Sequence, residues 1–340
     1  MKAQLKKFFT FFLISLLVFS TYSCSFKGKK TFEFNTGTIK VALVVSGTVS
    51  DSAWNAAAYN GLKRFQKDYN AKIAVVEKVA LTDARTVFPE LGQRGYDLVI
   101  ANSHEYSHIL MRAAKLFPET FFCVIGGDVY QEPNLCSFDF KDEQYGYLIG
   151  VVGGINTSTN KVGIVIGKKI PSVERTIIGI RQGLKSVNPK ADLIVSYINT
   201  WDDINKGREA AINQINTGVD IITHLADTAG IGVIKAAEET DVSAIGAITD
   251  QHDLAPSTVI TSGIQDASQL IYLVGEYYAE QILAPRIFRF GLYNQVIDLA
   301  PGYGNIEPTT ETRILRIKNQ LAEVEGNQLE EEARRTQQRH

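Results

Sequence analysis

Three side chains with ligand-binding chemistry lie close together near the start of the chain: Asp51, Trp54 and Asn55. They follow an apolar run at 41–45, a pattern typical of a strand that is covered on both faces. The intervening segment contains glycine and serine, which predicts a turn, and Ser50 or Asp51 could cap the helix that follows. Because ligands of open α/β sheets bind at the carboxyl ends of parallel strands, a carboxylate, an indole and an amide here predict a ligand site. In the alternative interpretation, Asp51 only caps the helix and Trp54 only packs.

A second group of residues, the pentapeptide HEYSH at 104–108, has the H-E-x-x-H spacing of zinc peptidases. On a continuous helix this spacing places two imidazoles on one face, with a glutamate beside them to activate water. Here the motif lies between an apolar, strand-like run at 97–101 and a helical pattern at 107–117. His104 and Glu105 therefore fall in a turn or a first helical turn, which disfavours a zinc site.

The rest of the chain also argues against a metallopeptidase. The sequence has neither the G-x-x-H extension nor a downstream E-x-x-x-D helix in a fitting register, and His224 could be a third ligand only if two lobes closed on it. We keep a zinc metallopeptidase as the least favoured alternative. The favoured interpretation is that the turn with Asn102, His104 and Tyr106 lines the ligand site, with Tyr106 or His104 as a second stacking face. A surface turn without ligand contact is the other interpretation.

One more candidate, Asp227, follows the strand-like run 220–224 and precedes a glycine-bearing helix start at 230–232. Its carboxylate and the helix amides could face the ligand, or Asp227 could be a simple cap. A dinucleotide-binding fingerprint fails here because Lys235 stands where glycine or alanine is needed. No nucleophile elbow, P-loop or pair of catalytic carboxylates stands out, so we predict neither catalytic residues nor metal ligands.

The amino terminus has the order of features that defines a secretory signal. Three lysines precede the apolar run 8–19, which is too short for a good membrane-spanning helix, and Ser23 and Cys24 follow it. A cysteine directly after a small residue predicts a lipoprotein signal peptide at 1–23, with Cys24 lipidated, and an uncleaved anchor is the alternative. We expect a tether at 24–38 and anchoring to a bacterial cell membrane, with the globular part in the periplasm or otherwise outside the inner membrane.

Composition excludes some partners and leaves the cysteines open. The formal net charge is -2 and the charges are interspersed, so neither a nucleic acid nor an anionic surface is implied as a partner. Cys123 and Cys136 both lie in apolar, strand-like settings. They could form one disulfide between adjacent strands, or they could remain buried thiols.

The chain alternates between apolar, strand-like runs and amphipathic helical stretches, which is the pattern of parallel βαβ units. The predicted strands are 41–45, 72–76, 97–101, 121–125, 136–140, 162–166, 192–197, 220–224, 243–248, 257–262 and 291–299. The alternation restarts behind a polar turn cluster at 156–160, which predicts two lobes. We assign 39–150 and 263–290 to the first lobe, 151–262 and 291–325 to the second, and 326–340 to a charged tail.

Several stretches taken together resemble one known family. SDSAWNAAAYNGL at 50–62 is similar to the D-x-x-F-N-x-x-x-x-x-G segment of the basic membrane protein family, the purine-nucleoside-receptor-like (PnrA-like) lipoproteins of ABC importers. AAKLFPETFFCVIG, EQYGYLIGVVGG, KVGIVIGKKIPSVERTIIGIRQGLKSVNP and ITDQHDLAPSTVITSG agree with it in order and spacing, and the match runs from about residue 39 to residue 301. The resemblance implies a type I periplasmic-binding-protein fold: two Rossmann-like α/β lobes with parallel sheets, joined by a hinge of several crossings, with the ligand between the lobes and no catalysis.

The resemblance also implies roles for individual residues. Asp51 stands where the family has a carboxylate that grips sugar hydroxyls, Trp54 where it has a stacking phenylalanine, and Asn55 where it has an asparagine. Asp250, in the segment ITDQ, stands at the carboxylate of the family's G-V-D-x-D-Q segment. Two departures matter: Gln265 replaces the lysine of the family's T-S-x-x-K segment, and Trp54 offers a wider plate than phenylalanine.

Both departures favour a broad ring system with a flexible polyol, and the family has a branch of riboflavin-binding lipoproteins. We therefore expect riboflavin as the transported ligand, with purine nucleosides as the alternative, and no cofactor. The expected protein is a lipid-anchored solute-binding monomer that delivers its ligand to an ABC permease and ATPase. A metabolite-sensing receptor with the same fold is the other role that fits the sequence.

Overall fold

The apolar runs of the sequence form the strands of two separate sheets in the computed structural model, which describes residues 31–50 and 54–337. Asp51, Cys24 and the predicted signal peptide at 1–23 lie outside the described residues. Within the part of the chain that is described, no helix is both long enough and apolar enough to cross a membrane.

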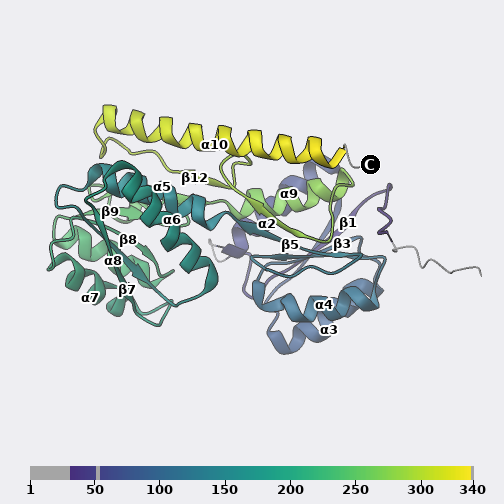
Figure 1. Ribbon diagram of the computed structural model, residues 1–340. Helices are drawn as coiled ribbons and strands as arrows, with labels where there is room; N and C mark the ends of the chain where they lie inside the picture. Colours follow the sequence, from purple (N-terminus) through teal and green to yellow (C-terminus); the bar gives the residue numbers. More distant parts are fainter. Residues whose placement is uncertain (1–30, 51–53, 338–340) are drawn as a thin grey trace, which may run out of the picture. The chain divides into compact units, whose positions relative to one another are not determined.

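The first sheet has six strands in the order β11-β5-β4-β3-β1-β2, and all neighbouring strands run parallel. They are β1 (Lys40–Val44), β2 (Lys72–Val76), β3 (Leu98–Ala101), β4 (Phe121–Ile125), β5 (Leu135–Phe140) and β11 (Ile287–Phe290). Helices α2 (Trp54–Tyr69) and α9 (Ala267–Ala279) pack together on one face, and α3 (Leu81–Gln93) and α4 (Ser107–Leu116) cover the other (Figure 1). Because both faces are covered, β3, β4 and β5 are buried at every residue.

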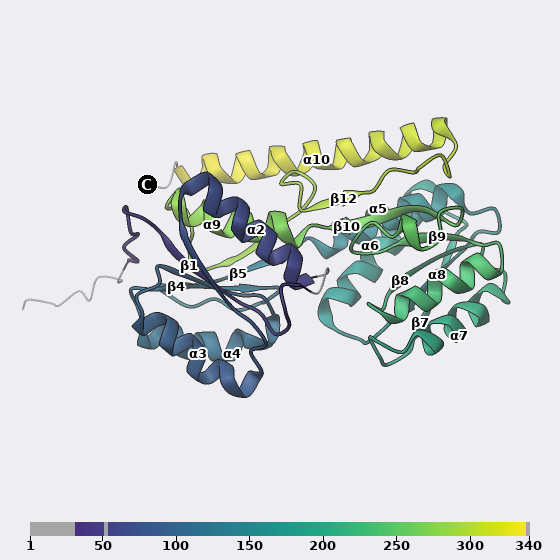
Figure 2. The same cartoon turned by 180° about the vertical axis from the view of Figure 1, so that it is seen from behind.

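The second sheet also has six strands, in the order β12-β10-β9-β8-β6-β7. They are β6 (Lys161–Ile166), β7 (Asp192–Tyr197), β8 (Ile221–Leu225), β9 (Ser243–Gly246), β10 (Val259–Gln265) and β12 (Ile297–Leu299), and β12 alone of these runs antiparallel. Helices α5 (Asp142–Asn156) and α6 (Pro171–Val187) form one packed pair, and α7 (Ile204–Ile215) and α8 (Ala229–Glu239) form another, on opposite faces of the sheet (Figure 2). The predicted α/β fold with two mostly parallel sheets is confirmed.

Glycines allow α5 and α6 to approach each other closely. A Cβ added at Gly146 would lie 2.1 Å from the carbonyl oxygen of Thr176, and one added at Gly183 would lie 2.0 Å from that of Tyr147. Any side chain at these positions would push the two helices apart. The close pair fixes the start of α5, which directly follows β5 of the first sheet.

The predicted strand 291–299 is wrong as a single element. β11 ends at Phe290 in the first sheet, and β12 begins only at Ile297 and pairs with β10 in the second sheet. The segment between them carries the chain from one sheet to the other, as do the β5–α5 and β10–α9 connections. The crossing was not predicted because apolar residues lie on both sides of it. An apolar pattern predicts a buried strand but does not indicate which sheet the strand joins.

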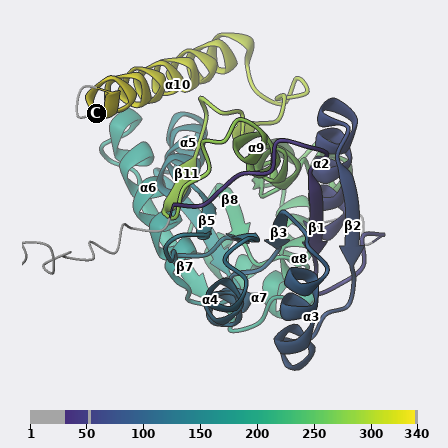
Figure 3. The same cartoon turned by 90° about the vertical axis from the view of Figure 1, so that its right-hand side faces the viewer.

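Helix α10 (Pro308–Gln337) contacts elements of both sheets. Lys318 donates to Asp298 in β12 at 2.6 Å, whereas Gln328 and Leu329 line a pocket together with β11 and α9. Figure 3 shows α10 on the side of the molecule that carries α5 and α9. The segment 326–337, which we expected to be part of a charged tail, continues this helix.

The two cysteines lie side by side as free thiols. Cys123 in β4 and Cys136 in β5 are register partners, and both are buried. Burial, followed by the neighbouring Cys123 thiol, raises the pKa of Cys136 well above its ordinary value. Of the two states that the sequence left open, the structure shows the reduced one.

Candidate functional site

Trp54, Asn55 and Asn102 meet at the carboxyl end of the first sheet. Trp54 begins α2, and its indole Nε1 donates to the carbonyl oxygen of Asn102 at 3.3 Å. Asn102 follows β3, and its Nδ2 donates to Asn55 Oδ1 at 3.2 Å. Both asparagines are buried, and Asn102 Oδ1 has no hydrogen-bond partner within the described residues. Three predicted site residues are thus in contact, and one buried amide oxygen is left for a ligand donor.

Phe140 belongs to the same edge, although we did not predict it as a site residue. It is the last residue of β5, and its ring centroid lies 6.0 Å from that of Trp54, with the ring planes tilted by 52°. This aromatic contact helps to fix the half-buried indole at the edge of the sheet. The sequence offered one indication of this role, an aromatic residue at the end of a predicted strand. Buried core strands also end in aromatic residues, so the indication did not single out Phe140.

The turn after β3 differs from its predicted role. His104 is exposed in the short 3-10 helix His104–Tyr106, whereas Tyr106 is buried in the core. The Tyr106 ring meets Phe88 edge-on at 5.4 Å, and its hydroxyl donates to the carbonyl oxygen of Val79 at 2.6 Å. A ring that is packed in this way offers no face to a ligand, so we withdraw Tyr106 as a stacking residue. The role of His104 stays a prediction.

The H-E-x-x-H motif does not form one continuous helical face. His104 and Glu105 lie in the 3-10 turn, and His108 lies in the first turn of α4. His224, the possible third ligand, is buried in β8, where its Nε2 lies 2.9 Å from Gln251 Oε1. Across residues 31–50 and 54–337, no group of three metal-ligating side chains is placed to hold a metal ion. The motif therefore fits a zinc site poorly.

Asp250 lies at the carboxyl edge of the second sheet, beyond β9. Its carboxylate accepts hydrogen bonds from the hydroxyl of Tyr303, from Ser262 Oγ at 3.4 Å and from the backbone N–H of His252 at 3.1 Å. The Tyr303 ring stacks on His252 with 3.9 Å between the centroids. Asp250 is nonetheless exposed, so a ligand hydroxyl can reach the carboxylate and share or replace these partners. Sequence reasoning missed Tyr303 because it lies far along the chain.

A strained turn presents Asp250. Ile248 has φ of 69°, a left-handed conformation that is costly for a β-branched residue. The backbone N–H of Thr249 donates to the carbonyl oxygen of Ala247 at 2.8 Å across this residue. The Ile248 N–H donates to the hydroxyl of Tyr145 at 3.1 Å, and its carbonyl accepts from the Gln265 N–H at 3.0 Å. Contacts from α5 and β10 therefore hold the strained residue in place.

Gln251, next to Asp250, is anchored by a buried histidine. Gln251 Oε1 accepts from the Ala247 N–H at 2.8 Å and lies 2.9 Å from His224 Nε2. Burial lowers the pKa of His224 to about 4, so the ring is neutral at physiological pH. Because Gln251 Oε1 is an acceptor, Nε2 of this neutral ring carries the proton. His224 thus fixes the segment behind Asp250.

Asp227, the other candidate at this sheet, forms no hydrogen bond or ion pair with the residues above within the described chain. Asp227 is exposed just after β8 in a left-handed conformation (φ of 49°), and partial burial together with Asp202 raises its pKa. Trp201 packs over Gly167, where an added Cβ would lie 2.2 Å from the indole. Asp227 keeps both of its predicted roles, ligand contact or cap.

Gln265 lies at a crossing between the sheets, in a network of buried charges. Its Nε2 donates to Asp142 Oδ1 at 3.3 Å. Arg175, from α6, donates to Asp142 Oδ2 through Nε at 3.0 Å and Nη2 at 2.6 Å, and Nη2 also reaches Asp139 Oδ2 at 3.0 Å. The side chains of Asp139 and Asp142 are only 7% and 4% exposed. Arg289 is a more distant partner of Asp139, at 3.8 Å.

This network holds more negative than positive charge in its interior. Two buried carboxylates share the guanidinium of Arg175. Burial and the neighbouring Asp139 raise the pKa of Asp142 to about 7, although Arg175 and Gln265 act in the opposite direction. The pKa of Asp139 is also raised, chiefly by burial. Near neutral pH, this pair therefore binds a proton for part of the time, whereas ordinary aspartates are fully ionised there.

The network joins the two groups of candidate residues. Asp139 accepts from the backbone N–H of Phe140 at 2.9 Å, and Phe140 touches Trp54. On the other side, Gln265 is bonded to Asp142 and, through its backbone, to Ile248 in the turn before Asp250. A continuous path of contacts thus connects Trp54 at the first sheet with Asp250 at the second.

The comparisons with known proteins show which family the chain belongs to. The profile of the family described as "ABC transporter substrate-binding protein PnrA-like" matches residues 38–330. This chain belongs to that family. Basic membrane protein B of Borreliella burgdorferi is 28% identical over 301 residues, which is 85% of this chain and 87% of the relative.

Two solved structures with similar folds are relatives of different kinds. A solute-binding protein of an ABC transporter system from Conexibacter woesei is 28% identical, with a TM-score of 0.69 and coverage of 85% of this chain and 97% of the other. A transcriptional activator of the comK gene from Bacillus halodurans is 25% identical, with a TM-score of 0.72 and coverage of 82% and 96%. The predicted type I periplasmic-binding-protein fold is confirmed.

Membership in the PnrA-like family sets the general function. Proteins of this family are extracytoplasmic substrate-binding proteins of ABC transporters, which take a small molecule and work with a permease and an ATPase. The carboxyl edges of the two sheets, with Trp54 on one and Asp250 on the other, are the parts of this chain suited to such a molecule.

Proposed function

We propose that this protein captures riboflavin outside the inner membrane and delivers it to an ABC permease and ATPase. The observation that carries the proposal is the setting of Trp54: its indole is anchored to Asn102 through Nε1, rests beside Phe140 and stays half-buried at the edge of the first sheet. A fixed indole is a wide stacking plate for a flat heterocycle, worth about 1–3 kcal/mol per ring.

The polar groups around this plate suit a ligand with a neutral, flexible polyol. Asn102 Oδ1 is a buried acceptor without a partner in the described chain, and it can accept from an N–H on the ring edge. The amide of Gln265 is already bonded to Asp142 and brings no positive charge to the site. We propose that Asp250 and the undescribed Asp51 accept hydrogen bonds from polyol hydroxyls, each worth about 1.5–3 kcal/mol when the acceptor is ionised.

The test is a titration of riboflavin with the purified protein, read as quenching of flavin fluorescence. Stacking on an indole quenches the flavin, so wild-type protein should quench it at micromolar concentration, and Trp54→Ala should not. Trp201→Phe is the matched control, because it removes the other tryptophan of the chain and should leave quenching intact. Absence of quenching by the wild type, or equal quenching by Trp54→Ala, would contradict the proposal.

Purine nucleosides are the alternative ligand. A competition experiment on the same protein sample distinguishes them from riboflavin. Buried asparagine amides such as Asn55 and Asn102 can also read the edge of a purine. If adenosine or guanosine displaces bound riboflavin and binds more tightly in calorimetry, the nucleoside is the better ligand. If riboflavin binds and the nucleosides do not compete, the alternative is excluded.

We further propose that Cys24 carries the lipid anchor and that the protein is a non-catalytic monomer. The arrangement of the first 24 residues is the support for lipidation. In cells, Cys24→Ser should move the protein from the membrane fraction to the soluble fraction without changing ligand affinity. A variant that stays in the membrane fraction would favour an uncleaved anchor instead.

A sensing role is the second candidate, and the likeness to the transcriptional activator from Bacillus halodurans favours it. Deletion of the gene should have different effects if the protein serves transport and if it serves sensing. Deletion should abolish uptake of labelled riboflavin if the protein feeds a permease. Unchanged uptake together with an altered transcriptional response to riboflavin would identify a sensor.

A further inference from the structure

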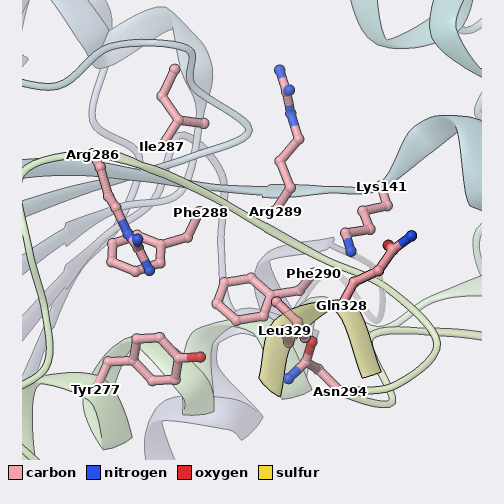
Figure 4. A pocket seen from close by; sticks show the side chains of 10 residues that line it. All are labelled: Lys141, Tyr277, Arg286, Ile287, Phe288, Arg289, Phe290, Asn294, Gln328 and Leu329. Carbon is pink, nitrogen blue, oxygen red and sulfur yellow. The ribbon is translucent and has the colours of Figure 1, made fainter. Parts of the chain in front are cut away.

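A pocket lies next to the network around Arg175, outside the groups formed by Trp54 and by Asp250. Arg289, which also approaches Asp139, lines it, as does Lys141, which lies between Phe140 and Asp142 in the sequence. The volume of the pocket is about 240 Å³, and it is formed by β11, α9, the crossing after β11 and the end of α10. Figure 4 shows its lining: Lys141, Tyr277, Arg286, Ile287, Phe288, Arg289, Phe290, Asn294, Gln328 and Leu329. The elements that meet here are distant in sequence, so the pocket is a product of the fold.

All charged residues of this lining are cations, and Arg286 is the one free to bind an anion. Lys141 is paired with the buried carboxylate of Glu325 at 2.8 Å. Arg289 extends away from Tyr277 in Figure 4 and lies 3.8 Å from Asp139. Arg286 lies over the ring of Phe288, with its Cζ 4.3 Å from the centroid, and forms no ion pair with any described residue.

The walls of the pocket are apolar and aromatic. Phe288 and Phe290 are buried and face Tyr277, whose ring meets each of them edge-on at 5.5 Å. Leu329 of α10 adds an aliphatic side chain. A ring or short aliphatic body can therefore lie against these walls while its charged end meets Arg286.

Polar side chains around the walls still have hydrogen-bonding capacity. The hydroxyl of Tyr277 and the side-chain amides of Asn294 and Gln328 form no hydrogen bond with any described residue. Figure 4 shows the three residues around the same opening. Aromatic walls, converging polar groups and one unpaired guanidinium are together suited to a small molecule that has an apolar body and a charged end.

We propose that this pocket binds a compact organic anion, a carboxylate attached to a flat or aliphatic body. The carboxylate pairs with the planar fork of Arg286, and the body packs against Phe288, Phe290 and Leu329. The cavity is smaller than the roughly 300–1,000 Å³ pockets that hold drug-sized ligands, so the body is limited to about one ring. This site is independent of the proposed riboflavin site.

Benzoate is the probe, and benzyl alcohol is the neutral probe of similar shape. In ligand-observed NMR titrations, benzoate should bind the wild-type protein at millimolar concentration or below, and benzyl alcohol should bind at least about tenfold more weakly. Arg286→Gln should lose at least about tenfold in benzoate affinity, whereas Arg286→Lys should retain part of it. Trp54→Ala should bind benzoate as the wild type does.

Two further variants separate the pocket from general charge effects. Arg316→Gln removes an exposed arginine on another part of α10 and should leave benzoate affinity unchanged. Leu329→Asp places a carboxylate in the pocket and should weaken benzoate binding as Arg286→Gln does. Equal binding of the two probes, unchanged affinity in Arg286→Gln, or no saturable benzoate binding would each overturn the proposal.

Discussion

Removing Arg175 should destabilise the protein in a way that depends on pH. The change Arg175→Met keeps the aliphatic stem of the side chain and deletes the guanidinium that pairs with Asp142 at 2.6 Å and Asp139 at 3.0 Å. Both carboxylates stay buried, and Gln265 and the more distant Arg289 are the side chains that still contact them, beside the backbone N–H of Phe140. The cost is therefore the free energy of holding two carboxylates in the interior without their main counter-charge.

The expected magnitude follows from the burial of the three side chains. Breaking a fully buried ion pair typically costs about 3–5 kcal/mol. Arg175 is 23% exposed, which weakens the pair, and Asp142 can escape part of the cost by protonation. We therefore expect the free energy of unfolding to fall by about 2–3 kcal/mol above neutral pH.

The direction of the pH effect follows from the raised pKa of Asp142. Its pKa is about 7 in the folded protein against 3.8 ordinarily, so between these values the folded protein holds a proton that the unfolded chain has lost. This group therefore makes the wild type less stable as pH rises through that window. Without Arg175, the pKa of Asp142 in the folded protein rises further, so the variant continues to lose stability at higher pH than the wild type does. The difference in the free energy of unfolding between wild type and variant is therefore larger at about pH 8 than at about pH 5.

Urea unfolding of four proteins at the two pH values is the assay. Arg175→Met with Asp142→Asn should recover most of the loss at the higher pH, because an amide replaces one of the buried charges. Arg208→Met is the matched control: it breaks an exposed pair with Glu239 and should leave the midpoint nearly unchanged at both pH values. A deficit that is equal at both pH values, or a double variant no more stable than the single one, would refute the charge argument.

Three other changes test separate parts of the structure. Trp54→Phe should retain most of the riboflavin affinity, whereas Trp54→Ala should lose about 5- to 150-fold in calorimetry, because it deletes the stacking plate. Cys123 and Cys136 should react with a thiol reagent only after unfolding, since both are buried and the Cys136 pKa is raised; fast labelling of the native protein would contradict their placement. Gln265→Lys should lower the pKa of Asp142 and flatten the fall in stability between about pH 4 and pH 7, measured by urea unfolding; an unchanged slope would show that Asp142 does not titrate there.

The fold was largely predictable because its strands are covered on both faces. Continuous apolar runs such as 121–125 and 162–166 mark buried parallel strands, and they recur with the spacing of βαβ units. The route between the sheets was not predictable. At 291–296 a glycine and polar residues interrupt an apolar stretch, and nothing local indicates that the chain leaves one sheet there and joins the other.

The candidate site was predictable only where residues follow strands. Trp54, Asn55 and Asn102 each lie shortly after a predicted strand, and parallel pairing brings those ends to one edge. Tyr106 satisfied the same rule, but its ring turned into the core, because a large aromatic side chain near an edge can pack inward as readily as outward. The charged cluster around Arg175 was not predicted, because its members come from four elements that are separate in the sequence: β5, α5, α6 and β10.

The same cluster shows a structural role for Gln265 in addition to its predicted role at the ligand site. From sequence, Gln265 was a ligand residue that had lost a charge. In the structure its amide meets Asp142, so a lysine there would have supplied a second cation to two buried carboxylates. With glutamine, Arg175 alone offsets them at close range, and the surplus negative charge contributes to the pKa of about 7 for Asp142. The cost of a neutral residue at position 265 is therefore a less stable buried carboxylate at the crossing between the sheets.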